Sequence, residues 1–104
     1  MPREMFRRSE NLEMFQIEET LLQELEDAGL IEPLRATAEA PACEEPCYHR
    51  SHVENIRVAV ALTRELEIDL PAAEIILRMR ERILAMQRQV REFLQVIARE
   101  FSEE

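Results

Sequence analysis

The chain has 104 residues, enough for one small domain but too few for a large catalytic cleft beside a core. It is 46% hydrophobic and 34% charged, with one Gly and no Trp, which is typical of a helical domain rather than a disordered or sheet-rich one. The formal net charge is −9, and most of the acidic excess lies in residues 1–52, a distribution that repels phosphate and attracts basic protein faces.

Two short helices are predicted in the first third of the chain. Residues 1–10 show no periodicity that decides between strand, helix and tail, but Leu12 and Phe15 indicate a short helix over 10–16. A second helix is predicted over 17–28, because its apolar residues fall on one face: Ile17, Leu21, Leu25 and Ala28, with Leu22 beside them. Gly29 follows where a helix-ending residue turns left-handed. Two short helices joined by a tight turn predict a helix-turn-helix.

A loop and a third helix are predicted next. Residues 30–50 hold three of the five prolines and no periodicity, which indicates a loop. Residues 30–31 and 47–48 are the pieces able to pair as short strands, and that pairing would make the loop the wing of a winged helix. Ser51 and Glu54 have the spacing of a capping box at the start of a helix over 51–67.

The longest predicted helix runs over residues 70–101. Asp69 and Pro71 mark its start, since Asp accepts hydrogen bonds from unpaired N–H groups and Pro has φ preset for a first turn. Ala73, Leu77 and Leu84 form an apolar row that predicts packing on the helix's own domain. A second row, called the seam here, follows a heptad spacing: Ile76, Met79, Ile83, Met86, Val90, Phe93 and Ile97. A helix about 45–50 Å long outreaches the rest of the chain, so the seam predicts a homodimer, of parallel or antiparallel sense.

An acidic surface is the second notable feature. Between Arg8 and Arg35 the chain carries eight acids and no base. The positions on this stretch predicted to bind a basic protein partner are Glu19, Gln23, Glu24 and Asp27. The alternative is a helix face that is merely solvated, as most charge runs are.

Cys43, Cys47, His49 and His52 are residue types found in zinc sites, but their spacing is not a standard one and Pro46 restricts the chain. We therefore expect no metal and reduced thiols, since a disulfide between the two cysteines does not suit a reducing cytosol. The sequence has no Ser/His/Asp set, phosphate loop or acid pair, so we expect neither catalysis nor a cofactor. It has no long apolar run and no signal-peptide core, so we expect a cytoplasmic protein without a membrane segment.

Several motifs together resemble the winged helix-turn-helix of MerR-type regulators. These are Gly-Leu-Ile-Glu-Pro at 29–33, Tyr48 just before a capped helix, and a long terminal helix. Val-Ala-Leu-Thr-Arg-Glu-Leu-Glu-Ile-Asp-Leu-Pro at 60–71 and Ile-Ile-Leu-Arg-Met at 75–79 resemble the chaperone-modulator (CbpM) branch in particular. That resemblance implies an all-α fold with a winged helix-turn-helix domain over 1–69 and a dimerisation helix over 70–104. It also implies binding and inhibition of the J-domain of a DnaJ-type co-chaperone.

The second helix departs from the DNA-binding members of that family. Those relatives carry an Arg and an Arg-Tyr-Tyr run that meet the DNA, whereas this chain has Thr20 and then Gln-Glu-Leu at 23–25. Eight acids without a base would oppose each phosphate contact, so DNA binding is disfavoured but not excluded. The alternatives that stay open are a MerR-family DNA-binding transcriptional regulator and a metal or redox sensor acting through Cys43 and Cys47.

Overall fold

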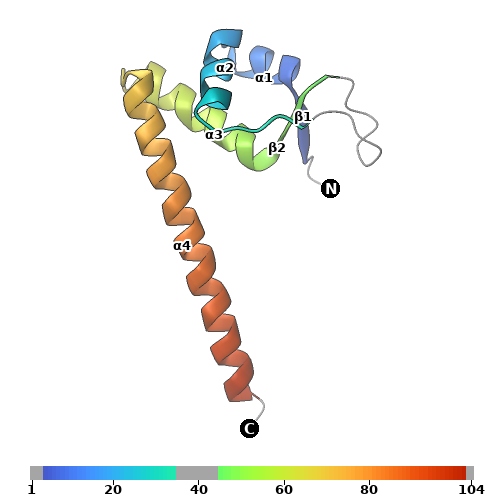
Figure 1. Ribbon diagram of the computed structural model, residues 1–104, viewed down its shortest axis with the longest axis vertical. Coiled ribbons are helices and arrows are strands. Elements are labelled where there is room, and N and C mark those ends of the chain that lie inside the picture. Colours follow the sequence, from blue (N-terminus) through green and yellow to red (C-terminus); the bar gives the residue numbers. More distant parts are fainter. Residues whose placement is uncertain (1–3, 35–44, 103–104) are drawn as a thin grey trace.

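The computed structural model describes residues 4–34 and 45–102 (Figure 1). The elements in chain order are β1 (Met5–Arg7), α1 (Arg8–Phe15), α2 (Glu19–Asp27), β2 (Cys47–His49), α3 (Arg50–Val60), the π-helical turn η1 (Ala61–Glu65) and α4 (Leu70–Ser102). The four predicted helices are confirmed. Everything before α4 forms a head, from which α4 extends as an arm. The radius of gyration is accordingly 17.2 Å, above the ~13 Å expected for a compact chain of this length.

The core of the head lies between α2, α3 and the first turns of α4. Its buried residues are Leu22, Leu25, Leu30, Ile31, Tyr48, Val53, Ile56, Ala59 and Leu77. Ala73 and Leu77 are fully buried, which confirms that the start of α4 packs on its own head. Leu84 was expected in the same row, but that prediction is wrong because its side chain is 44% exposed. About four turns into α4, the arm has therefore left the head.

Gly29 ends α2 as the sequence predicts. Its φ is +76°, and its N–H donates to the carbonyl of Glu26 at 3.0 Å. The N–H of Leu30 donates to the carbonyl of Leu25, also at 3.0 Å. These two bonds form a Schellman motif, which satisfies the last carbonyls of the helix and turns Leu30 into the core.

The two strands form a small antiparallel sheet, so the fold is mainly helical rather than wholly so. Phe6 lies opposite Tyr48 in the pairing of β1 with β2. The predicted pairing of residues 30–31 with 47–48 is wrong, because the turn at Gly29 directs Leu30 and Ile31 into the core. Leu34 forms an isolated bridge to Cys47 instead. Residues 35–44, which hold most of the predicted wing loop, lie outside the described ranges.

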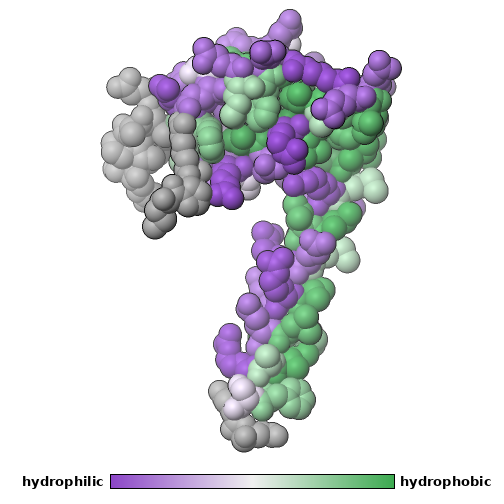
Figure 2. All heavy atoms as spheres, turned by 180° about the vertical axis from the view of Figure 1, so that it is seen from behind, coloured by the Kyte–Doolittle hydropathy of each residue, from purple (hydrophilic) through white to green (hydrophobic). Residues whose placement is uncertain are grey.

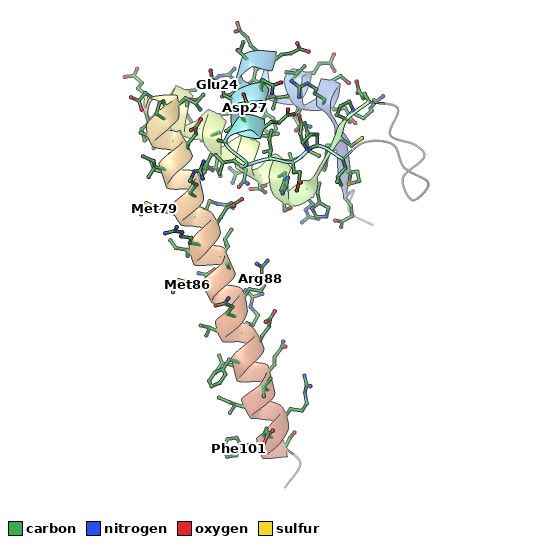
Figure 3. All side chains as sticks on the ribbon, viewed as in Figure 1. Glu24, Asp27, Met79, Met86, Arg88 and Phe101 are labelled. Carbon is green, nitrogen blue, oxygen red and sulfur yellow. The ribbon has the colours of Figure 1, made fainter. Side chains whose placement is uncertain are left out.

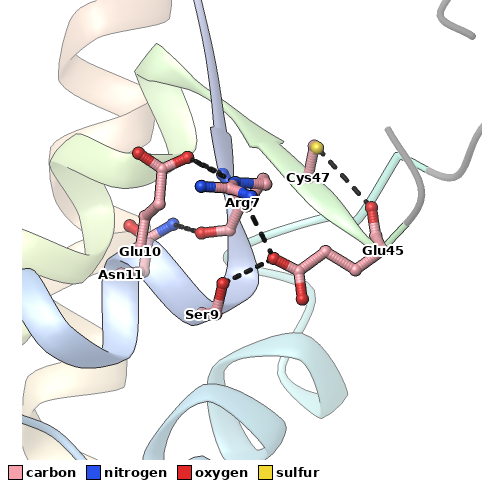
Figure 4. A network of polar contacts seen from close by, with 6 residues as sticks. All are labelled: Arg7, Ser9, Glu10, Asn11, Glu45 and Cys47. Atoms are coloured by element: carbon pink, nitrogen blue, oxygen red, sulfur yellow. Dashed lines mark hydrogen bonds and ion pairs between the residues drawn. The ribbon is translucent and has the colours of Figure 1, made fainter. Parts of the chain in front are cut away.

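A polar network fixes the N-terminal strand to α1 (Figure 4). The N–H of Arg7 donates to Oε1 of Glu10 at 3.1 Å, which closes a capping box at the start of α1. Nδ2 of Asn11, a fully buried residue, donates to the carbonyl of Arg7 at 2.8 Å. Glu45, two residues before β2, reaches the same place and accepts a hydrogen bond from the hydroxyl of Ser9. Residues 5–10 therefore have a defined structure without any hydrophobic period.

The cap of α3 differs from the predicted one. The helix begins at Arg50, and Nδ1 of His49 accepts the N–H of Ser51 at 3.2 Å. The predicted capping box of Ser51 with Glu54 is wrong, since Glu54 accepts from Arg57 at 3.0 Å. That hydrogen bond lowers the pKa of the Glu54 carboxyl.

The predicted helix over 51–67 changes from an α-helix to a π-helix before it ends. In η1 the N–H of Leu66 donates to Ala61, five residues back, at 3.3 Å. The wider turn shifts the helical phase. Leu66, which follows this turn, is consequently 65% exposed. Glu67 then adopts a left-handed φ of +53°, and the chain reverses into α4.

Asp69 caps α4 as predicted, since its Oδ1 accepts the N–H of Ala72 at 3.0 Å. Replacing Asp69 by Ala is expected to lower the free energy of unfolding by about 1 kcal/mol, because that N–H loses its partner. Urea denaturation at a fixed protein concentration measures the change. Asp69→Ser retains a capping oxygen and should recover most of the loss, whereas equal stability of all three proteins would contradict a role for the cap.

Candidate interaction surfaces

The acidic face of α2 contains the four residues predicted to bind a partner. Leu22 and Leu25 are fully buried, so the helix presents its other side to solvent. All four predicted residues are exposed on that side: Glu19, Gln23, Glu24 and Asp27. Figure 3 places Glu24 and Asp27 on α2, on the side toward the start of α4. These residues are available for a partner.

The charges of this face are not neutralised within the described parts of the chain. There, Glu19, Glu24 and Asp27 form no ion pair, and Asp27 accepts only from the side-chain amide of Gln23, at 3.0 Å. Unpaired exposed acids on one helix give a local negative potential that attracts cations and basic protein surfaces.

Glu26 on the same helix behaves differently. Nη1 of Arg8 donates to its Oε1 at 2.6 Å, and the hydroxyl of Tyr48 donates to the same atom. Burial, and then the hydrogen bond to Glu26, raise the pKa of the Tyr48 hydroxyl far above its usual range, so it stays protonated as a donor. This triad joins α1, α2 and β2. Glu26 is thus part of the structure of the head and is not an interaction residue.

A shallow hollow of about 370 Å³ connects the acidic face to the arm. It is lined by Glu24, Asp27, Ala28, Glu74 and Arg78. Nη2 of Arg78 donates to the carbonyl of Ala28 at 2.9 Å, so the guanidinium is engaged at the end of α2. The sequence places Glu24 and Asp27 far from the long helix, whereas the fold sets them beside its first turns.

The seam lies on the outer side of α4. Six of its seven residues are exposed, with values up to 64% at Phe93, and Ile97 is half-buried. Figure 2 shows apolar residues following one side of the arm along its length. In Figure 3, Met79, Met86 and Phe101 point away from the head, and Arg88 points to the opposite side. A stripe this long is unusual on the surface of a monomeric protein.

The apolar stripe is wider than the heptad pattern predicts. Leu94, Val96 and Phe101 are each at least 50% exposed beside the last seam residues, and Ile75 is exposed beside the first. Heptad positions on a straight α-helix rotate by about 20° per heptad about the helix axis. Apolar residues that stay on one side of the arm therefore move from one heptad position to the next. Tracking a period of 3.6 residues would have found Leu94 and Phe101.

The three candidate metal ligands that lie in the described residues, Cys47, His49 and His52, do not converge. Cys43 lies outside the described ranges, and the Sγ of Cys47 lies 3.5 Å from the carbonyl of Glu45. His49 lies beside Glu4 and Ser51, while Nδ1 of His52 accepts the N–H of Glu32 at 2.8 Å. Over residues 4–34 and 45–102, no group of three His, Cys, Asp or Glu side chains is placed to hold a metal ion.

Comparison with known protein families gives one match. Residues 6–95 match the model of the family described as MerR HTH family regulatory protein. The matched range begins within β1, covers the rest of the head and ends in the outer part of α4. A regulatory family of this kind suggests a regulator without enzymatic activity. No curated protein sequence and no solved structure matches the chain. In the described part of the chain, every helix is too short or too polar to cross a lipid bilayer.

Proposed function

The chain belongs to the MerR family of helix-turn-helix regulatory proteins, and from that premise we propose a non-enzymatic regulator that acts by binding another protein. The proposed partner is the J-domain of a DnaJ-type co-chaperone, which the regulator inhibits by covering the face that the J-domain offers to its chaperone. The resemblance to the chaperone-modulator branch at 60–71 and 75–79 names this partner. The acidic face of α2 is the observation that carries the proposal.

The charge of α2 supports a protein partner over duplex DNA. A helix in the major groove needs Lys or Arg to position it on phosphates, and α2 contains neither between Glu19 and Asp27. Each exposed acid would add repulsion to a polyanion, whereas the J-domains bound by the resembling branch present a basic helix. The partner-binding residues of the proposal are the exposed four: Glu19, Gln23, Glu24 and Asp27.

A homodimer is the second part of the proposal, with the seam as its interface and residues 70–104 as its dimerisation helix. The seam side chains Met79, Ile83 and Met86 are all more than half exposed in the single chain. A groove of about 530 Å³ between Ile83, Val90 and Leu94 offers space for side chains of a second arm. Burying apolar area is favourable by about 25 cal/mol per Å², so covering the stripe removes a substantial cost.

Titration of the protein against its cognate J-domain and against duplex DNA tests the proposed function. At 0.15 M salt we expect saturable binding of the J-domain and no tight or sequence-specific binding of DNA. J-domain binding should weaken as salt rises, because the exposed charges are screened beyond about 8 Å at that ionic strength. Tight DNA binding without J-domain binding would refute the proposal.

A DNA-binding regulator is the second candidate, favoured by the family match itself. Arg50 and Arg57 are exposed on α3, the helix that follows β2, and would have to supply phosphate contacts that α2 lacks. Arg57 is already paired with Glu54 at 3.0 Å, which leaves Arg50 as the more available of the two. The DNA arm of the same titration distinguishes this candidate.

A further inference from the structure

A cavity lies in the angle between α3 and α4, on the side of the arm that faces the head. Its volume is about 350 Å³, and we call it the crook pocket. Its main lining residues are Ser51, His52 and Asn55 from α3, with Arg80, Leu84 and Arg88 from α4. Arg88 and the seam residues Met79 and Met86 point to opposite sides of α4 in Figure 3. The pocket would therefore stay open if the seam were covered.

The guanidinium of Arg80, one of the two cations that line the crook pocket, is held in place by a hydrogen bond. Nη1 of Arg80 donates to Oδ1 of Asn55 at 3.2 Å, and Asn55 is only 2% exposed. Asn55 is itself fixed, because its Nδ2 donates to the carbonyl of Leu30 and to Oε1 of Glu81, both at 2.7 Å. A guanidinium has five N–H donors, so most of those on Arg80 remain for a ligand.

The other polar groups of the crook pocket are also mainly donors. Nδ1 of His52 accepts the N–H of Glu32, so a neutral ring carries its proton on Nε2. Arg88 forms no ion pair with any described residue, whereas the Ser51 hydroxyl in the first turn of α3 lies 2.9 Å from Nδ1 of His49 and is already engaged there. Glu81 is the one carboxylate in the lining, and its Oε1 is already bound by Asn55. The lining residues thus carry two guanidinium groups against one carboxylate in a protein of net charge −9, and Glu54, outside the lining, also interacts electrostatically with Arg80.

We propose that the crook pocket binds a small oxyanion, a molecule carrying a phosphate or carboxylate group. Guanidinium groups bind both kinds of group through paired N–H donors. The volume lies within the ~300–1,000 Å³ of small-molecule sites, and Leu84 and Ala85 supply an apolar wall for the remainder of the ligand. Donors from both α3 and α4 meet the same anion, so binding would also hold the arm at a fixed angle to the head.

Nuclear magnetic resonance titration of the full-length protein tests the site, with inorganic phosphate and succinate as separate probes. The Arg side-chain Nε–H signals and the Ser51 amide are followed at constant ionic strength maintained with sodium chloride. We expect saturable shifts at the crook pocket with at least one probe. Saturation by phosphate alone assigns a phosphate ligand, and tighter binding of succinate assigns a carboxylate ligand.

Three variants make the titration specific. Arg88→Gln should weaken binding about tenfold, the loss of one charge-assisted hydrogen bond. Glu81→Gln should strengthen it, because a nearby negative charge is removed. Arg99→Gln is the matched control, since it removes one Arg from the far end of the same helix and should leave binding unchanged.

Absence of saturation with both probes would overturn the proposal. Equal weakening by Arg88→Gln and Arg99→Gln would do the same, because the effect would then come from overall charge. Circular dichroism checks that each variant is folded. If Arg88→Gln does not fold, the opposite change expected for Glu81→Gln still decides the question.

Discussion

Replacing Ile83 and Val90 together by Asp is expected to convert the proposed dimer to a monomer. Both side chains are more than half exposed in the single chain, at 53% and 58%, so the substitutions introduce no charge into the head. In the proposed dimer each carboxylate would be buried against the partner arm, at a cost of several kcal/mol per unpaired charge. Sedimentation equilibrium at micromolar concentration measures the change in mass.

A matched control uses the opposite side of the arm. Arg88→Asp with Gln95→Asp has the same seven-residue spacing and adds more negative charge, but both positions lie away from the seam. We expect this variant to remain dimeric. A wild-type protein that sediments as a monomer, or a control that dissociates as completely as the seam variant, would contradict the assignment of the interface.

Reversing the charge of Glu24 and Asp27 to Arg is expected to weaken J-domain binding by one to two orders of magnitude, roughly the loss of two favourable charge pairs. The structure adds a second reason, because Arg78 lines the same hollow as both positions and the new cations would add to its positive charge. Calorimetric titration of the cognate J-domain measures the affinity, and the salt dependence should become shallower in the variant.

The control for this experiment is Glu13→Arg on α1 with Glu92→Arg on α4. It changes the net charge of the protein by the same amount as the reversal of Glu24 and Asp27. That variant should bind the J-domain nearly as well as the wild type. Because Glu24 and Asp27 lie close to the first turns of α4, the mass of the reversed variant must also be measured. Unchanged J-domain affinity in a folded, dimeric variant would rule out the acidic face as the contact.

The parts of the fold that sequence predicts well are those set by local signals. Asp69, Pro71 and the apolar period locate α4, and Gly29 locates the end of α2, because a cap or a left-handed turn depends on a few neighbouring residues. The strand pairing was not predictable in this way. Phe6 meets Tyr48 across forty-two residues, and the choice between residues 5–7 and 30–31 as partner depends on the packing of the whole head.

The interaction surfaces also have features set by local sequence and features set by the packing of distant segments. Exposure of Glu24 and Met79 follows from helical periodicity, so the outline of both surfaces was accessible from sequence. Sequence does not predict that Glu24 lies near Arg78 or that Arg80 contacts Asn55, because both depend on how the head packs against the arm. The π-helical turn η1 is another feature of this joint that sequence does not predict, since the spacing of apolar residues in 61–65 does not distinguish it from an α-helix.

Helix α4 is fixed to the head at Ala73 and Leu77 and carries its apolar stripe further out. This arrangement constrains how the length of the arm can change between related proteins. A single residue inserted after Leu77 would turn every outer side chain by about 100° about the helix axis, and would move the stripe to another side of the head. Seven residues inserted after Phe93 would turn the outer part by only about 20° while lengthening the arm by about 10 Å. Related proteins that keep the proposed assembly should therefore differ in arm length by multiples of seven residues. In an antiparallel dimer, the two heads would then lie correspondingly closer together or further apart.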